Sequence, residues 1–79
     1  MDTVTGVRNV VAKVMNIDAD RITLETSLEH DLAADSLDRV EIILGLEETF
    51  EIAFDDEGPA ATTIREIVEQ VDAMRGVAV

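Results

Sequence analysis

The chain has 79 residues, of which 47% are hydrophobic and 3% aromatic, so it is long enough for one small domain with an aliphatic core. It contains no cysteine, which excludes disulfide scaffolds, thiolate metal sites and cysteine nucleophiles. Eighteen acidic residues against six basic ones give a formal net charge of −12, which disfavours nucleic acids and anionic membranes as partners.

The excess charge is concentrated in the middle of the chain. Residues 25–57 contain twelve acidic side chains and one basic one, which accounts for −11 of the −12. Such a surface attracts basic protein surfaces or divalent cations, although a solvated face that only confers solubility stays an alternative. The start, MDTVTGVRNVVAKVM, is unlike a signal peptide, and no apolar run reaches the length of a membrane span. We therefore expect a soluble cytoplasmic protein.

In chain order, the first predicted element is an amphipathic helix over residues 3–15, whose apolar arc covers about 140°. Residues 16–35 lose that period and are predicted to be a long ordered loop pinned by apolar side chains. These are Ile22, Leu24, Leu28 and Leu32. Loops of this length in small domains are usually functional.

Residues 36–50 are predicted to form a second helix with a wider apolar arc of about 220°, typical of a helix that contacts several neighbours or lines a cavity. Residues 51–62 are predicted to be a loop, in which EGPAA could hold one helical turn. Thr63 and Glu66 have capping-box spacing at the start of a last helix, which Gly76 ends. The predicted fold is all-α: a small three- to four-helix bundle with a long first loop, in one domain of residues 1–79.

Ser36 stands where the long loop meets the second helix, within the stretch DLAADSLDRVEI of residues 31–42. If Asp35 caps the helix and Asp38 takes its third position, the Ser36 hydroxyl is free and exposed. The alternative, which the local sequence alone favours, is that Ser36 is itself the N-cap.

Ser36 is not predicted to be a catalytic nucleophile. The only histidine, His30, lies six residues upstream, and neither a Gly-rich oxyanion loop nor a Gly-x-Ser-x-Gly elbow surrounds the serine. Asp31, Asp35 and Asp38 could share a divalent ion weakly, but nothing in the sequence requires a metal. We expect no enzymatic activity from this chain alone.

DLAADSLDRVEI resembles the prosthetic-group attachment motif of acyl carrier proteins, whose pattern is close to D-L-G-A-D-S-L-D-x-V-E-[LIF]. LGLEETFEI and TTIREIVEQV resemble the rest of the second helix and the last helix of that family, so the resemblance covers essentially the whole chain. It implies that a phosphopantetheinyl transferase esterifies Ser36 with 4′-phosphopantetheine from coenzyme A, and that Asp35 helps to present the serine.

The resemblance also implies that the second helix contacts basic docking patches on the enzymes that build and transfer acyl chains. The partner-binding residues would be Leu37, Asp38, Val40, Glu41, Ile42, Glu47 and Glu48. An acyl chain, held as a thioester, would be sheltered among the helices. The residues of that acyl pocket would be Ile43, Leu46, Phe50, Phe54, Ile64 and Val68.

The implied function is a monomeric carrier for fatty-acid synthesis rather than an enzyme. A specialised carrier of polyketide, lipid A or aminoacyl groups is the nearest alternative, and an unmodified acidic adaptor is the alternative from another class. Three departures from the family pattern leave the pathway open. Ala33 replaces the usual glycine, where a positive φ would be strained, Leu28 replaces a common phenylalanine, and the segment of residues 51–62 is shorter than usual.

Overall fold

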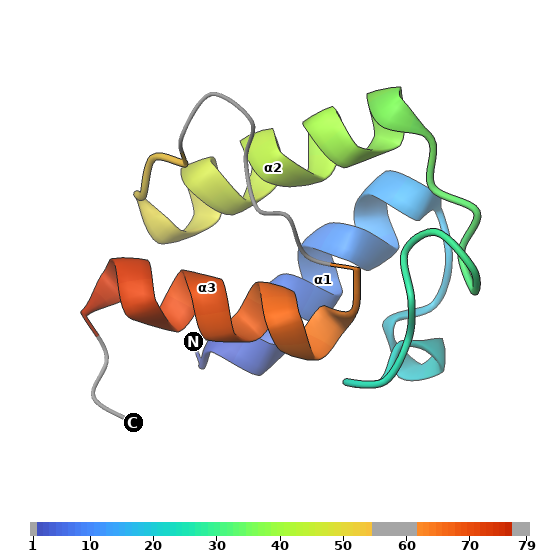
Figure 1. The fold of residues 1–79 in the computed structure, drawn as a ribbon, viewed down its shortest axis with the longest axis horizontal. Helices are drawn as coiled ribbons and strands as arrows, with labels where there is room; N and C mark the ends of the chain where they lie inside the picture. The colour runs from blue at the N-terminus through green and yellow to red at the C-terminus, as the bar shows by residue number, and fades with distance from the viewer. Residues whose placement is uncertain (1, 55–61, 77–79) are drawn as a thin grey trace.

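The computed structural model describes residues 2–54 and 62–76. It contains α1 (Thr3–Met15), a short 3₁₀ helix η1 (Ala19–Arg21), α2 (Ser36–Phe50) and α3 (Ile64–Arg75) (Figure 1). The predicted all-α bundle and its three long helices are confirmed, and η1 adds a turn inside the predicted loop. The helical turn predicted for EGPAA lies outside the described residues.

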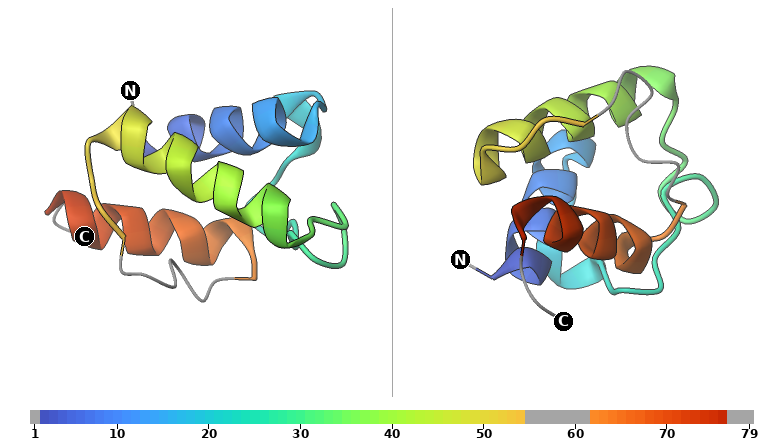
Figure 2. Two further views of the ribbon diagram at one scale, coloured as in Figure 1. Left: turned by 90° about the horizontal axis from the view of Figure 1, so that it is seen from above. Right: turned by 60° about the vertical axis from the view of Figure 1, so that its left-hand side comes forward.

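α1 is the central helix of the bundle. It packs against both α2 and α3, which contact each other much less (Figures 1 and 2). The core they share is aliphatic, and its most completely buried side chains are Val7, Val11, Ile22, Ile42, Leu46, Ile64, Ile67 and Val71. Gly45 allows α2 to approach α1 closely, because a Cβ at this position would lie 2.8 Å from Cγ1 of Val10.

The long loop between α1 and α2 is held by apolar side chains and by backbone hydrogen bonds to the start of α3. Ile22 and Leu28 are buried in the core, as predicted. The N–H of Leu28 donates to the carbonyl of Thr62 at 2.9 Å, and the N–H of Ile64 donates to that of Thr26 at 3.0 Å. These contacts fix the course of the loop and therefore the point at which the chain enters α2.

Ala33 lies in this loop with a φ of 53°, the left-handed conformation that favours glycine. That conformation costs a residue with a Cβ about 1–2 kcal/mol, and a glycine at this position removes the cost. Glycine also gives the unfolded chain more conformational freedom, which offsets about 0.4–1 kcal/mol of this gain in stability. We therefore expect Ala33→Gly to raise the free energy of unfolding by about 0.5–1 kcal/mol, measured by urea denaturation. Ala34→Gly is the control and should lower it, because Ala34 has no positive φ. A loss of stability in both variants would contradict the prediction.

The start of α3 is the predicted capping box. The Thr63 hydroxyl accepts a hydrogen bond from the N–H of Glu66 at 3.3 Å, and the Glu66 carboxylate accepts one from the N–H of Thr63 at 3.2 Å. The same carboxylate accepts a bond from the Thr62 hydroxyl at 2.8 Å. These bonds, of which the one from Thr62 has the largest effect, lower the pKa of Glu66 below its ordinary value.

Acidification should therefore weaken the start of α3. A carboxylate whose pKa is lowered on folding stabilises the folded state above its unfolded pKa, and this contribution is lost as the pH falls through the lowered value. Glu66→Gln removes this titration, so its thermal midpoint should fall less than that of the wild type between about pH 6 and about pH 3. Glu69→Gln, at an exposed site without a side-chain hydrogen bond, should behave like the wild type. Equal falls in the thermal midpoint of the wild type, Glu66→Gln and Glu69→Gln would refute the role of Glu66 in this loss of stability.

A polar contact joins all three helices at the end of the bundle where α2 finishes. The hydroxyl of Thr3, in the first turn of α1, donates to the carboxylate of Asp72 and accepts from Nη1 of Arg75 at 2.8 Å. The guanidinium of Arg75 also lies 5.0 Å from the centroid of the Phe50 ring. Arg75 therefore ties the last turns of α2 and α3 to the first turn of α1, at the opposite end of α2 from Ser36.

Candidate functional site

The start of α2 is a capping box made by two acids. Oδ1 of Asp35 accepts from the N–H of Asp38 at 2.9 Å, and Oδ2 of Asp38 accepts from the N–H of Asp35 at 3.2 Å. The N-cap is thus Asp35, and the interpretation with Ser36 as the cap is wrong. In a capping box, the side chain three residues after the N-cap accepts a hydrogen bond from the N–H of the N-cap. For a cap at Ser36 that residue would be Arg39, whose guanidinium accepts no hydrogen bond.

Ser36 is the first residue of α2 and is exposed. Its hydroxyl makes no hydrogen bond within the described part of the chain, because Asp35 and Asp38 satisfy the helix start. The first N–H groups of a helix lack intrahelical partners and lie at the positive end of the dipole. A phosphodiester on this hydroxyl would therefore be favoured, so the residues present fit an esterified phosphate group.

The weak divalent-ion site predicted for Asp31, Asp35 and Asp38 is wrong. Within residues 2–54 and 62–76, no group of three acids or histidines is placed to hold a metal ion. Each of the three carboxylates instead accepts a backbone hydrogen bond. Asp35 and Asp38 cap each other's N–H, and Asp31 accepts from the N–H of Ser27 at 2.7 Å. His30 is exposed in the same loop, and its backbone N–H donates to the hydroxyl of Ser27 at 3.1 Å.

α2 has apolar side chains on two faces. Leu37, Val40 and Leu44 are 65%, 50% and 57% exposed, on the side away from the core. Ile42 is only 2% exposed and belongs with Leu46 to the buried face, so its predicted contact with partners is wrong. Leu44 is missing from the predicted partner surface, although its spacing of seven residues from Leu37, about two helical turns, places both on one face.

The acids predicted to bind partners fall into two groups. Glu41 and Glu48 are exposed, and their carboxylates make no hydrogen bond or ion pair among the described residues. Asp38 is engaged in the cap, and the carboxylate of Glu47 accepts from the N–H of Phe54 at 2.8 Å. Glu41 and Glu48 are therefore the two carboxylates of this set that no structural contact occupies.

A family model described as "Phosphopantetheine attachment site" matches residues 5–71. The acyl carrier proteins of Campylobacter jejuni subsp. doylei and of Campylobacter jejuni strain RM1221 are each 40% identical over 76 residues, which cover 95% of this chain and 99% of theirs. The acyl carrier protein of Trieres chinensis is 34% identical over 73 residues, 91% of each chain. The chain belongs to the acyl carrier protein family. The cofactor of that family, 4′-phosphopantetheine, is a group that the free hydroxyl at the start of α2 can accommodate.

The six residues predicted to form the acyl pocket of this carrier do not share one degree of burial. Leu46, Ile64 and Val68 are buried, and Ile43, Phe50 and Phe54 are half-buried. All except Ile43 belong to the hydrophobic core or pack against it. An acyl chain among them would require these side chains to move apart, because protein cores are closely packed.

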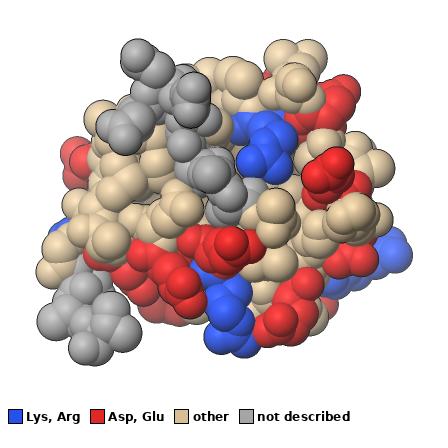
Figure 3. All heavy atoms as spheres, in the orientation of Figure 1, with Lys and Arg blue, Asp and Glu red and all other residues tan. Residues whose placement is uncertain are grey.

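The surface of the carrier is dominated by acids. Figure 3 shows groups of acidic side chains with fewer basic ones between them. Arg65 forms an exposed ion pair with Glu25, with a Nη2–Oε1 distance of 2.5 Å, and this hydrogen bond raises the pKa of Arg65. Exposed pairs of this kind contribute little to stability. None of the described helices is long and apolar enough to span a bilayer.

Proposed function

We propose that this chain is a cytoplasmic carrier, without catalytic activity of its own, that holds acyl groups during fatty-acid synthesis. The observation that carries the proposal is Ser36: an exposed hydroxyl at a helix start whose cap is supplied by its neighbour Asp35. The relatives named acyl carrier protein support it over nearly the full length of the chain. When attached, the prosthetic group supplies a thiol that holds the acyl group as a thioester, which suits a chain without cysteine.

In the attachment step, the oxygen of Ser36 forms a bond to the phosphorus that bears the pantetheine arm of coenzyme A. The pyrophosphate bond of coenzyme A breaks, the adenosine part leaves with the other phosphate, and the hydroxyl proton passes to a base of the separate transferase. The chain contributes the nucleophilic hydroxyl and the positive end of the α2 dipole. Asp35 acts as a positioning residue, because its cap leaves that hydroxyl unbonded.

Intact-mass measurement tests this function directly. Wild-type protein incubated with coenzyme A, magnesium and a phosphopantetheinyl transferase should gain the mass of one prosthetic group. An unchanged mass would overturn the proposal in favour of an unmodified acidic adaptor. The acyl groups on protein isolated from its host then separate fatty-acid synthesis from the alternatives, since polyketide, lipid A and aminoacyl carriers would hold different chains.

The exposed acids of α2 should govern recognition by partner enzymes. Charges at the edge of an interface mainly set the rate of encounter, so Glu41→Lys together with Glu48→Lys should slow association with an acyl-chain synthase by about tenfold at low salt. The loss should shrink as the ionic strength rises. Glu69→Lys reverses one charge at an exposed site on α3, and Glu48→Lys alone, which changes the net charge by the same amount, is compared with it. Equal effects at the two places, measured by stopped-flow or surface plasmon resonance, would show that only total charge matters.

A further inference from the structure

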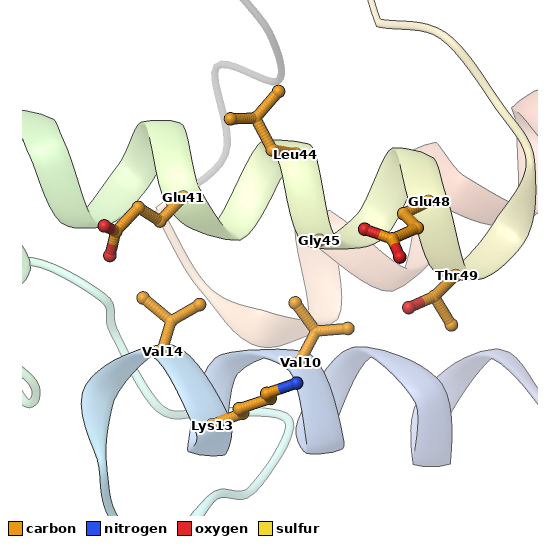
Figure 4. A pocket seen from close by; sticks show the side chains of 8 residues that line it. All are labelled: Val10, Lys13, Val14, Glu41, Leu44, Gly45, Glu48 and Thr49. Carbon is orange, nitrogen blue, oxygen red and sulfur yellow. The ribbon is translucent and has the colours of Figure 1, made fainter.

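A groove of about 490 Å³ runs between α1 and α2 (Figure 4). Val10 and Val14 of α1 give it an apolar lining, and Leu44 of α2 also borders it, although the Leu44 side chain points away from α1 (Figure 4). Gly45 lets Val10 pack directly against the backbone of α2 in the groove, because a Cβ at this position would lie 2.8 Å from Cγ1 of Val10. Leu44 belongs both to this groove and to the exposed apolar face of α2, and the groove is therefore continuous with the surface proposed to bind partners.

The two walls of the groove carry charges of opposite sign. Lys13 projects from α1, whereas Glu41 and Glu48 project from α2 (Figure 4). No ion pair joins Lys13 to either carboxylate in the described structure, so all three charges are available to a ligand. Of the residues that line the groove, Glu41 and Thr49 are the furthest apart along α2, about 12 Å, which matches roughly two turns of a helix laid beside it.

We propose that the α1–α2 groove is a second contact for the enzymes that dock on α2. It would receive an amphipathic helical segment with an apolar side chain on the groove floor, basic side chains facing Glu41 and Glu48, and an acidic side chain facing Lys13. Such a segment pairs every charge of the groove. An acyl chain would instead leave those charges partly desolvated and unpaired, which is costly. The inference rests on the proposed function, because it concerns the partners of a carrier.

Lys13 gives this inference a test in which two effects have opposite signs. Because the carrier is strongly acidic, a basic partner is repelled by Lys13 at long range, and removing that charge should speed encounter. If an acidic side chain of the partner pairs with Lys13 in the groove, removing the charge should instead weaken the complex. Lys13→Gln therefore separates local pairing from overall charge.

The first experiment measures affinity by surface plasmon resonance, with the carrier bearing its prosthetic group and the fatty-acid condensing enzyme of its host. Lys13→Gln should weaken binding by about two- to fivefold, the range of one exposed ion pair. Gln70→Glu, on α3, changes the net charge by the same amount and should leave the affinity nearly unchanged. Affinity for Lys13→Gln equal to or tighter than that of the wild type would overturn the groove contact. A wild-type chain that takes no prosthetic group would instead overturn the proposed function.

The second experiment uses the fact that Lys13 is the only lysine of the sequence. Peptide mapping after brief treatment with an amine-acetylating reagent therefore reports on a single side chain. Saturating condensing enzyme should slow acetylation of Lys13 by severalfold if the segment occupies the groove. Unchanged acetylation in the complex would refute the contact. Slowing in the free protein on loading with an acyl group, without any partner, would assign the groove to the acyl chain and also refute it.

Discussion

Replacing Ser36 with alanine should abolish attachment of the prosthetic group and leave the fold unchanged. The hydroxyl is the atom that would form the phosphodiester, so the Ser36→Ala protein should show no gain in intact mass under conditions in which the wild type is fully converted. Ser36 is exposed and lies outside the capping hydrogen bonds, and such surface substitutions usually change stability by less than about 0.5 kcal/mol. Circular dichroism should therefore give the same helical signal and nearly the same thermal midpoint.

Two further variants make this result specific. Ser27, the only other serine, has a hydroxyl that accepts a hydrogen bond from the N–H of His30 at 3.1 Å, and Ser27→Ala should still be modified. Asp35→Asn keeps an oxygen that can cap α2 but removes the charge. If the transferase recognises the charge of Asp35, the Asp35→Asn protein should be modified more slowly than the wild type, with the same thermal midpoint. Modification that persists in Ser36→Ala, or that maps to another residue, would refute the assignment.

The helices were predictable because their signals are local. Apolar side chains at helical spacing place α1 and α3, and the Thr63–Glu66 box and Gly76 mark the two ends of α3. The loop leucines also follow from the sequence, since a long polar segment needs buried side chains to be ordered. The cap of α2 was harder to predict, because Asp35 and Ser36 are both residue types that cap helices well. They are distinguished only by the residue three positions later, which is Asp38 for Asp35 and Arg39 for Ser36.

The remaining features depend on contacts between distant parts of the chain. The wide apolar arc of α2 does not say which side faces the core, so the sequence alone could not separate Ile42, which is buried in the core, from the exposed Val40 and Leu44. The positive φ of Ala33 was indicated only by the glycine that the family pattern has there, since nothing in the residues around Ala33 encodes it. The α1–α2 groove likewise is lined by residues from two helices that are distant in the sequence, among them Val10 and Gly45, which are 35 positions apart.

Replacing Leu46 with alanine should cause a large loss of stability. Leu46 is 0% exposed at the centre of the core, and truncating such a leucine costs about 2–5 kcal/mol through lost burial and the cavity left behind. A domain of this size has a total stability of about 4–12 kcal/mol, so the loss is a large fraction of it. Urea denaturation followed by circular dichroism should show a much lower midpoint, or a protein already partly unfolded in buffer.

Leu44→Ala is the matched control, because it makes the same change two residues away on the same helix. Leu44 is 57% exposed, so its truncation should cost less than about 0.5 kcal/mol. If Leu46→Ala does not fold, Leu46→Met keeps most of the volume and should cost less than about 1.5 kcal/mol, which provides a measurable step in the same direction. Similar losses for Leu44→Ala and Leu46→Ala would mean that α2 does not present one face to the core and the opposite face to its surroundings. That result would also remove the exposed surface on which partner recognition depends in the proposed function.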